Sequence, residues 1–173
     1  ATVAALATLD MRGGWLKADA MTVSPSADLR FTGGTMLLSN GVSYWLGSSH
    51  AFGSQAGLGL PVLRIAQGEL RPGHLNVTGR LDVGAFGWAH LQVEAGGHLA
   101  TAGGATLGQG VSLGFTMARG DGLATVEGAD ATWINTGALD IGNVGQGRLQ
   151  VLAGGRVATG SAFMGRGTPP ESL

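Results

Sequence analysis

The sequence predicts an all-β fold of the β-solenoid type. Three observations carry this prediction: a surplus of glycine, short runs of alternating apolar and polar residues, and an internal repeat. The 173 residues include 33 Gly and 5 Pro, well above ordinary usage. The glycines have no period of three, which excludes collagen. With 44% hydrophobic and 12% charged residues, the chain lacks the composition of disordered proteins.

Short runs in the chain alternate aliphatic and polar side chains and end near a glycine. In a strand, this period of two places the aliphatic side chains on one face and the polar ones on the other. Each run therefore predicts a short, half-buried strand. One stretch, residues 2–11, is the only candidate for a helix. The six clearest strand runs begin at Leu75, Leu81, Leu91, Leu123, Leu139 and Leu149.

An internal repeat separates a solenoid from other β folds. Residues 79–101 align with residues 137–159 at an offset of 58, and 13 of the 23 positions are identical. With about 20 residues per coil, this offset predicts three coils, and the chain about eight coils in a rod of about 40 Å. Equivalent residues Asp82 and Asp140 are predicted to face water about 14 Å apart. The predicted interior ladders contain Leu81, Val83, Leu91, Val93, Leu139, Ile141, Leu149 and Val151.

Glycine recurs at fixed places in the two blocks. Only glycine adopts positive φ without penalty and allows another backbone to approach closely. We therefore expect the recurring glycines to mark the corners of coils. These positions include Gly84, Gly96, Gly97, Gly142, Gly154 and Gly155.

The stretch 126–157 carries a recognisable pattern. It contains Thr-Trp-Ile-Asn at 132–135, Leu-Asp-Ile-Gly at 139–142 and Leu-Gln-Val at 149–151. This pattern resembles the repeat in passenger segments of type V secreted autotransporters, and residues 79–110 resemble its second half. The resemblance implies a right-handed parallel β-helix, with Trp133 and Asn135 in structural roles. It also implies export across the outer membrane of a Gram-negative bacterium, through a C-terminal outer-membrane barrel of the parent chain, to the cell surface or the medium.

The expected function is therefore that of an adhesin, a self-association module or a structural stalk, without catalysis. The expected partner is a host surface protein or glycan, or a second copy. A carbohydrate-active β-helix enzyme, either a polysaccharide lyase or a hydrolase, is the alternative, followed by a phage tail-fibre segment. Asp121, Glu127 and Asp130 lie close enough in sequence to converge as carboxylates, although glycines beside them also indicate ordinary turns.

Composition excludes several other classes of function. Ten basic residues against eleven acidic ones provide no basic surface for nucleic acid. Zero cysteines exclude disulfides and thiolate chemistry. The four histidines lack the spacing of a zinc site. We therefore expect no catalytic residues, no metal and no cofactor.

The chain is predicted to divide into three parts. Residues 1–70 form an irregular or capping β portion of the solenoid, 71–167 the regular β-helix repeats, and 168–173 a tail. Aromatic residues gather in the least repetitive part, where an excursion from the solenoid suits either recognition or a cap over its end. The candidate recognition residues are Tyr44, Trp45, His50 and Phe52.

Overall fold

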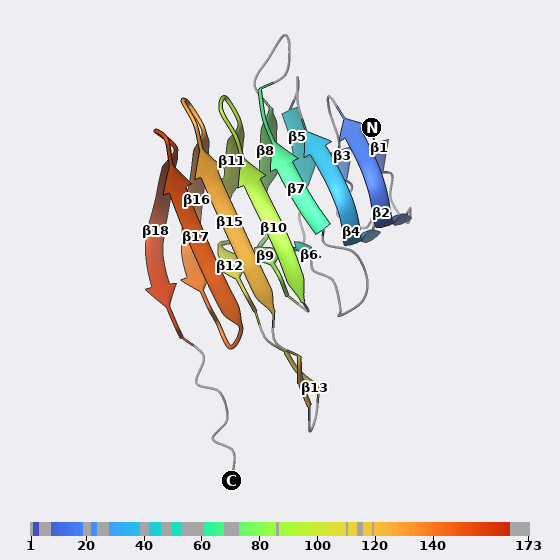
Figure 1. The fold of residues 1–173 in the computed structure, drawn as a ribbon, viewed down its shortest axis with the longest axis vertical. Coiled ribbons are helices and arrows are strands. Elements are labelled where there is room, and N and C mark those ends of the chain that lie inside the picture. The colour runs from blue at the N-terminus through green and yellow to red at the C-terminus, as the bar shows by residue number, and fades with distance from the viewer. Residues whose placement is uncertain are drawn as a thin grey trace.

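The structure is a computed structural model whose described residues form an all-β fold of parallel sheets (Figure 1). Its description covers residues 2–3, 8–18, 22–23, 28–38, 42–45, 50–52, 61–67, 73–85, 87–109, 111–113, 116–118 and 120–166. Across these ranges, no helix is long and apolar enough to cross a membrane.

The strands of the parallel sheets lie side by side in three rows, the second and third of which belong to one ten-stranded sheet. The first row is a six-stranded parallel sheet formed by β2 (Thr8–Ala18), β4 (Asp28–Leu38), β7 (Pro61–Ile65), β10 (Trp88–Val93), β15 (Asp121–Glu127) and β17 (Gln146–Leu152). The second row contains β1 (Thr2–Val3), β3 (Thr22–Val23), β5 (Val42–Trp45), β8 (His74–Val77), β11 (His98–Thr101) and the first parts of β16 (Thr132–Ile141) and β18 (Arg156–Met164). The third contains β6 (His50–Phe52), β9 (Leu81–Val83), β12 (Ala105–Leu107) and the later parts of β16 and β18.

From β7 onward, the chain passes through the first, second and third rows in that order. We call each such set of consecutive strands a rung. Strands β7, β8 and β9 form one rung, and β10, β11 and β12 form the next. After β12 the chain forms a hairpin of β13 (Val111–Leu113) and β14 (Thr116–Ala118), the only antiparallel strand pair in the described part. In Figure 1 this hairpin projects away from the rows.

The prediction of three coils within the 58-residue repeat was wrong. Leu81 pairs with Ala105, and Ala105 pairs with Leu139, so the repeat spans two rungs. The second step is longer because it includes the hairpin between β12 and β15. The estimate of about eight coils was also too high, since the first row has six strands in the described part of the chain.

The core lies between the rows and is formed by every second residue of strands such as β7, β8, β10 and β15. The pattern is clearest in β10, whose side chains alternate between half-buried and buried. Within the first row, Leu63, Leu91 and Ala124 pair laterally and each is completely buried. Burying such aliphatic side chains contributes about 1.5–3 kcal/mol each, so these ladders dominate the stability of the fold.

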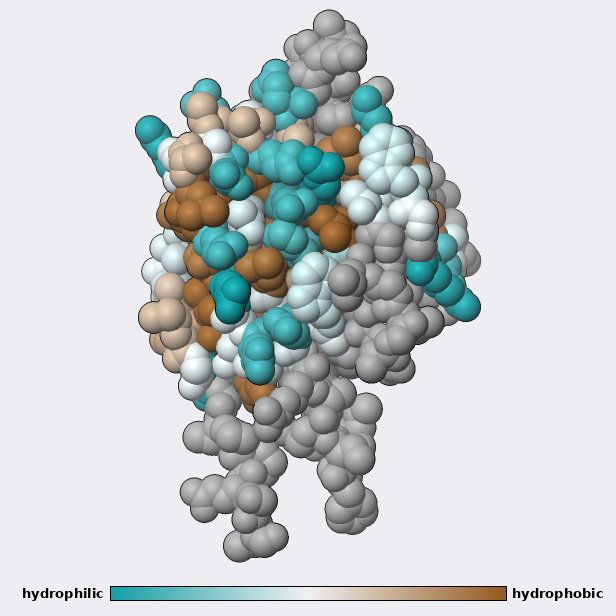
Figure 2. Space-filling model, viewed as in Figure 1, coloured by the Kyte–Doolittle hydropathy of each residue, from teal (hydrophilic) through white to brown (hydrophobic). Residues whose placement is uncertain are grey.

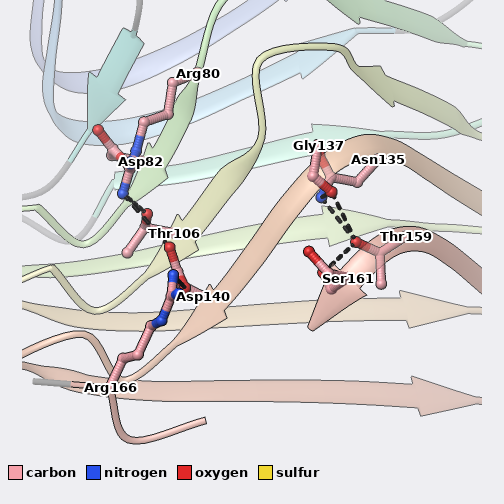
Figure 3. Close-up of polar contacts among 9 residues, drawn as sticks. All are labelled: Arg80, Asp82, Thr106, Asn135, Gly137, Asp140, Thr159, Ser161 and Arg166. Atoms are coloured by element: carbon pink, nitrogen blue, oxygen red, sulfur yellow. Dashed lines mark hydrogen bonds and ion pairs between the residues drawn. The ribbon is translucent and has the colours of Figure 1, made fainter. Parts of the chain in front are cut away.

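A line of polar side chains runs through this apolar core. Trp133 is completely buried, and its Nε1 donates a hydrogen bond to Thr101 Oγ1 at 3.1 Å. Thr101 Oγ1 donates to Asn135 Oδ1 at 2.8 Å, and Asn135 Nδ2 donates to Thr159 Oγ1 and to the Gly137 carbonyl, both at 3.0 Å (Figure 3). The interior polar groups are therefore satisfied by bonds between adjacent rungs.

Glycine is required where the chain turns between rows. Gly84 has φ +70°, and a Cβ atom there would lie 2.4 Å from the Asp121 carbonyl oxygen. Gly97 has no unusual φ, yet its Cβ would lie 2.2 Å from the Ile65 carbonyl oxygen. Any larger residue at these corners would force adjacent rungs apart.

The candidate helix over residues 2–11 is not helical in the described residues. Thr2–Val3 and Thr8–Ala18 are strands, because Thr8–Ala18 pairs in parallel with Asp28–Leu38. Tertiary pairing therefore overrides the local pattern. Strands β4 and β5 pair in turn with β7 and β8, so both rows continue across residue 70. The division into a capping portion and regular repeats stays a prediction, and the predicted tail 168–173 lies outside the described residues.

Candidate functional site

A cluster of charged side chains connects three strands of the third row. Asp82, Thr106 and Asp140 are lateral neighbours on β9, β12 and β16. Arg80 Nε donates to Asp82 Oδ1 at 2.7 Å, and its guanidinium also donates to Thr106 Oγ1 and lies 4.0 Å from Asp140 Oδ2 (Figure 3). Arg166 Nη1 donates to Asp140 Oδ1 at 3.3 Å. We call these five residues the paired cluster.

The prediction that Asp82 and Asp140 face water was wrong. They are only 9% and 7% exposed, because the guanidinium groups of Arg80 and Arg166 lie against their carboxylates. Their separation is also two rungs, about 9.6 Å at 4.8 Å per rung, rather than 14 Å. That distance is compatible with an inverting glycosidase pair, but Thr106 and the Arg80 guanidinium lie between the two carboxylates. In this arrangement the cluster holds adjacent rungs together.

A pocket of about 200 Å³ opens on the outer face of the first row. Its walls come from three neighbouring strands in register: Trp88 pairs with Asp121, and Asp121 pairs with Gln146. Figure 2 views this face, where hydrophilic side chains gather over the central strands. The lining residues are Trp88, Asp121, Leu123, Gln146, Gly147 and Arg148, and we call them the open pocket.

The polar side chains of the open pocket are not engaged in the fold. Within the described part of the chain, Asp121, Gln146 and Arg148 have no side-chain hydrogen bond or ion pair. Elsewhere in this part, four arginines pair with carboxylates within 4.0 Å: Arg12 with Asp10, Arg64 with Glu94, Arg80 with Asp82 and Arg166 with Asp140. The open pocket therefore presents an acceptor, an amide and a guanidinium that are free to bind a ligand.

Trp88 forms one wall of this pocket. It begins β10 with its side chain half-buried, and its ring meets the ring of His90 edge-on, with centroids 5.9 Å apart. His90 Nε2 in turn lies 3.0 Å from Thr125 Oγ1. Burial lowers the pKa of His90, and the charge of Glu94 opposes this shift. The histidine is therefore predominantly neutral at pH 7 and acts as packing for the indole.

A second histidine assembly lies on the second row. His74 and His98 are lateral partners on β8 and β11, and their rings stack with centroids 4.6 Å apart. Burial lowers the pKa of His74, and the neighbouring charge of His98 lowers it further. Nδ1 of His98 lies 2.5 Å from Thr132 Oγ1. Among the described residues, no three His or carboxylate side chains gather as a metal site.

The predicted recognition residues fall on two short strands. Tyr44 and Trp45 belong to β5, and His50 and Phe52 belong to β6. Their backbones pair with β8 and β9, respectively. Their side chains lie outside the described part of the structure, so their role in recognition stays a prediction.

The carboxylates suggested for an enzyme do not converge. Asp121 and Glu127 stand at opposite ends of β15, about 20 Å apart along an extended chain. Asp130 lies in the turn beyond, with φ 60°. The open pocket brings Asp121 together with Gln146 and Arg148 from another strand instead.

Comparison of the chain with models of known families, with curated proteins and with solved structures finds no match.

Proposed function

We propose that the chain is a right-handed parallel β-helix and forms part of an autotransporter-type passenger displayed at the cell surface or released from it, where it acts as an adhesive stalk. The observation that supports this most is the in-register stacking of three strand rows, from β7 to β18. The Thr-Trp-Ile-Asn pattern at 132–135 supports the passenger setting.

The architecture suits an extended scaffold. Each rung contacts only its neighbours, so such a fold grows in length without enlarging its core cross-section. The described core relies on ladders of aliphatic side chains, and the chain contains no cysteine. Outward side chains then repeat along the rows and provide a surface for binding, while the interior provides stiffness.

Surface display is tested on intact cells that produce the parent protein. An antibody raised against this chain should label unpermeabilised cells, and added proteinase K should remove the epitope while a periplasmic marker survives. An epitope that is accessible only after the outer membrane is permeabilised would contradict the proposal.

Self-association is a second candidate, favoured by the last strands of the rows. Val151 on β17 continues the buried line of Val93 and Val126 but is 45% exposed, and Met164 on β18 is 82% exposed. In the purified chain, lateral pairing with a second copy would cover this edge. In contrast, the β2 edge carries Asp10 and Arg12, which form an exposed ion pair.

Self-association is tested by sedimentation of the purified chain over a range of concentrations. The wild type should form dimers, and the double variant Val151→Lys with Met164→Lys should remain monomeric, because lysine at a strand edge opposes pairing. Asp10→Lys on the other edge serves as the control and should leave the association unchanged. A monomeric wild type at all concentrations would exclude this candidate.

A further inference from the structure

We propose that the open pocket is a binding site for one neutral pyranose unit of a glycan. The proposal deepens the adhesive role and rests on the proposed function for its biological setting. The binding itself depends only on the six residues that line the pocket on β10, β15 and β17.

The size of the pocket favours a single sugar ring. Its volume of about 200 Å³ is below the roughly 300–1,000 Å³ of sites for larger ligands. The pocket lies on the outer face of a strand row, where a longer glycan chain can extend into solvent on both sides. A nucleotide or a similar cofactor would exceed this space.

Trp88 provides an aromatic wall for the apolar side of a sugar. One face of a pyranose ring presents C–H groups, and the negative face of an indole attracts such weakly positive hydrogens. The edge-on contact with His90 at 5.9 Å restrains the indole before any ligand arrives. This restraint reduces the conformational entropy that the indole loses on binding.

Asp121, Gln146 and Arg148 provide the polar side of the site. A carboxylate accepts hydrogen bonds from two hydroxyls, a guanidinium donates them, and an amide does both. Trp88, Asp121 and Gln146 occupy adjacent register positions, about 4.8 Å apart, which places these groups across the width of one ring.

The balance of charge favours a neutral sugar. Asp121 and Arg148 contribute opposite charges to the same pocket. An acidic sugar would gain from Arg148 but would be repelled by Asp121, whereas hydroxyl groups satisfy both. Because neither side chain has a partner in the described part of the fold, a sugar breaks no internal hydrogen bond when it binds.

The backbone beneath the pocket is fixed by its neighbours. Gly147 lies between Gln146 and Arg148, and a Cβ there would be 2.2 Å from the amide nitrogen of Gly142. The polar groups therefore stand on strands held in place by close backbone packing, which favours a preorganised site.

The experiment is binding of the purified chain to an array of neutral hexose-terminated glycans beside sialylated and uronic-acid glycans. The wild type should be retained on neutral glycans. Trp88→Ala and Asp121→Asn should each weaken that retention at least tenfold, because the first removes the stacking surface and the second a charged acceptor. Trp15→Ala, which removes an indole 62% exposed on β2, is the matched control and should bind as the wild type does.

Circular dichroism and the melting temperature of each variant establish that it is folded before binding is compared. Retention on acidic glycans alone, no retention at all, or equal retention of all variants would overturn the proposal. The result is distinguishable from failure of surface display. Glycan binding by a chain that is not displayed would overturn the display proposal alone, and a displayed chain without glycan binding would overturn the pocket alone.

Discussion

The paired cluster and the open pocket use the same kinds of side chain on different rows of one molecule. In the paired cluster, Asp140 is 7% exposed and contacts two arginines. In the open pocket, Asp121 is exposed and has no side-chain partner among the described residues. A partnered carboxylate holds adjacent rungs together, while an unpartnered one remains available to a ligand.

The largest loss of stability is expected when a completely buried side chain is replaced. Replacing Trp133 with alanine should lower the free energy of unfolding by about 3–5 kcal/mol, since the change leaves a cavity and removes the bond to Thr101. The measurement is urea unfolding followed by circular dichroism. The exposed Trp15, replaced in the same way, should change the stability by no more than about 0.5 kcal/mol. Similar losses from both variants would contradict this description of the interior.

The second prediction compares the two aspartates directly. Asp140→Asn should lower the free energy of unfolding by about 1–2 kcal/mol, because two arginines lose a charged acceptor. The loss stays small because Arg80 and Arg166 are 36% and 53% exposed and water screens their charges. Asp121→Asn should lie within about 0.5 kcal/mol of the wild type. If Asp121→Asn destabilises the chain as much as Asp140→Asn does, the distinction between the two sites is wrong.

The third prediction concerns acid and has the smallest effect. The pKa of His74 and that of His90 are lowered in the folded state from 6.5, so the unfolded chain binds more protons near that pH. The contribution of these two histidines to the free energy of unfolding should therefore be fully present above pH 6.5. It should decline as the pH falls through 6.5 toward the lowered pKa values of the folded state. Melting temperatures measured over this range test the sign.

A matched variant tests whether the stacked histidines contribute to this change of melting temperature with pH. His74→Gln removes one ring from the pair with His98 and should flatten the decline of melting temperature with acid. A slope unchanged in this variant would mean that the stacked pair does not contribute to it.

Much of the fold could be predicted from the sequence, because side-chain alternation is local. The runs that begin at Leu75, Leu91 and Leu149 all begin within strands. Register is not local, however. The β13–β14 hairpin lengthens one step of the chain, so the number of rungs within the repeat could not be counted from spacing alone.

The residues of the open pocket could likewise be predicted only in part from the sequence. Trp88 and Gln146 occupy equivalent positions of the 58-residue repeat, as do His90 and Arg148, so the repeat indicated that these positions share a face. Asp121 lies on the strand between them, beyond the hairpin, and no repeat connects it to either. Its place beside Trp88 depends on the pairing of β10 with β15, which only the structure provides.

Disulfide formation between introduced cysteines tests the parallel register most directly. Both sites depend on this register, and the chain has no cysteine of its own. Gln92 pairs with Thr125, and Thr125 pairs with Gln150. The variant with cysteine at 92 and 125 should cross-link under mild oxidation, since lateral neighbours lie within disulfide reach, whereas cysteines at 92 and 150, about 9.6 Å apart, should not. Cross-linking of 92 with 150, and not with 125, would contradict the two-rung repeat and with it the assembly of both sites.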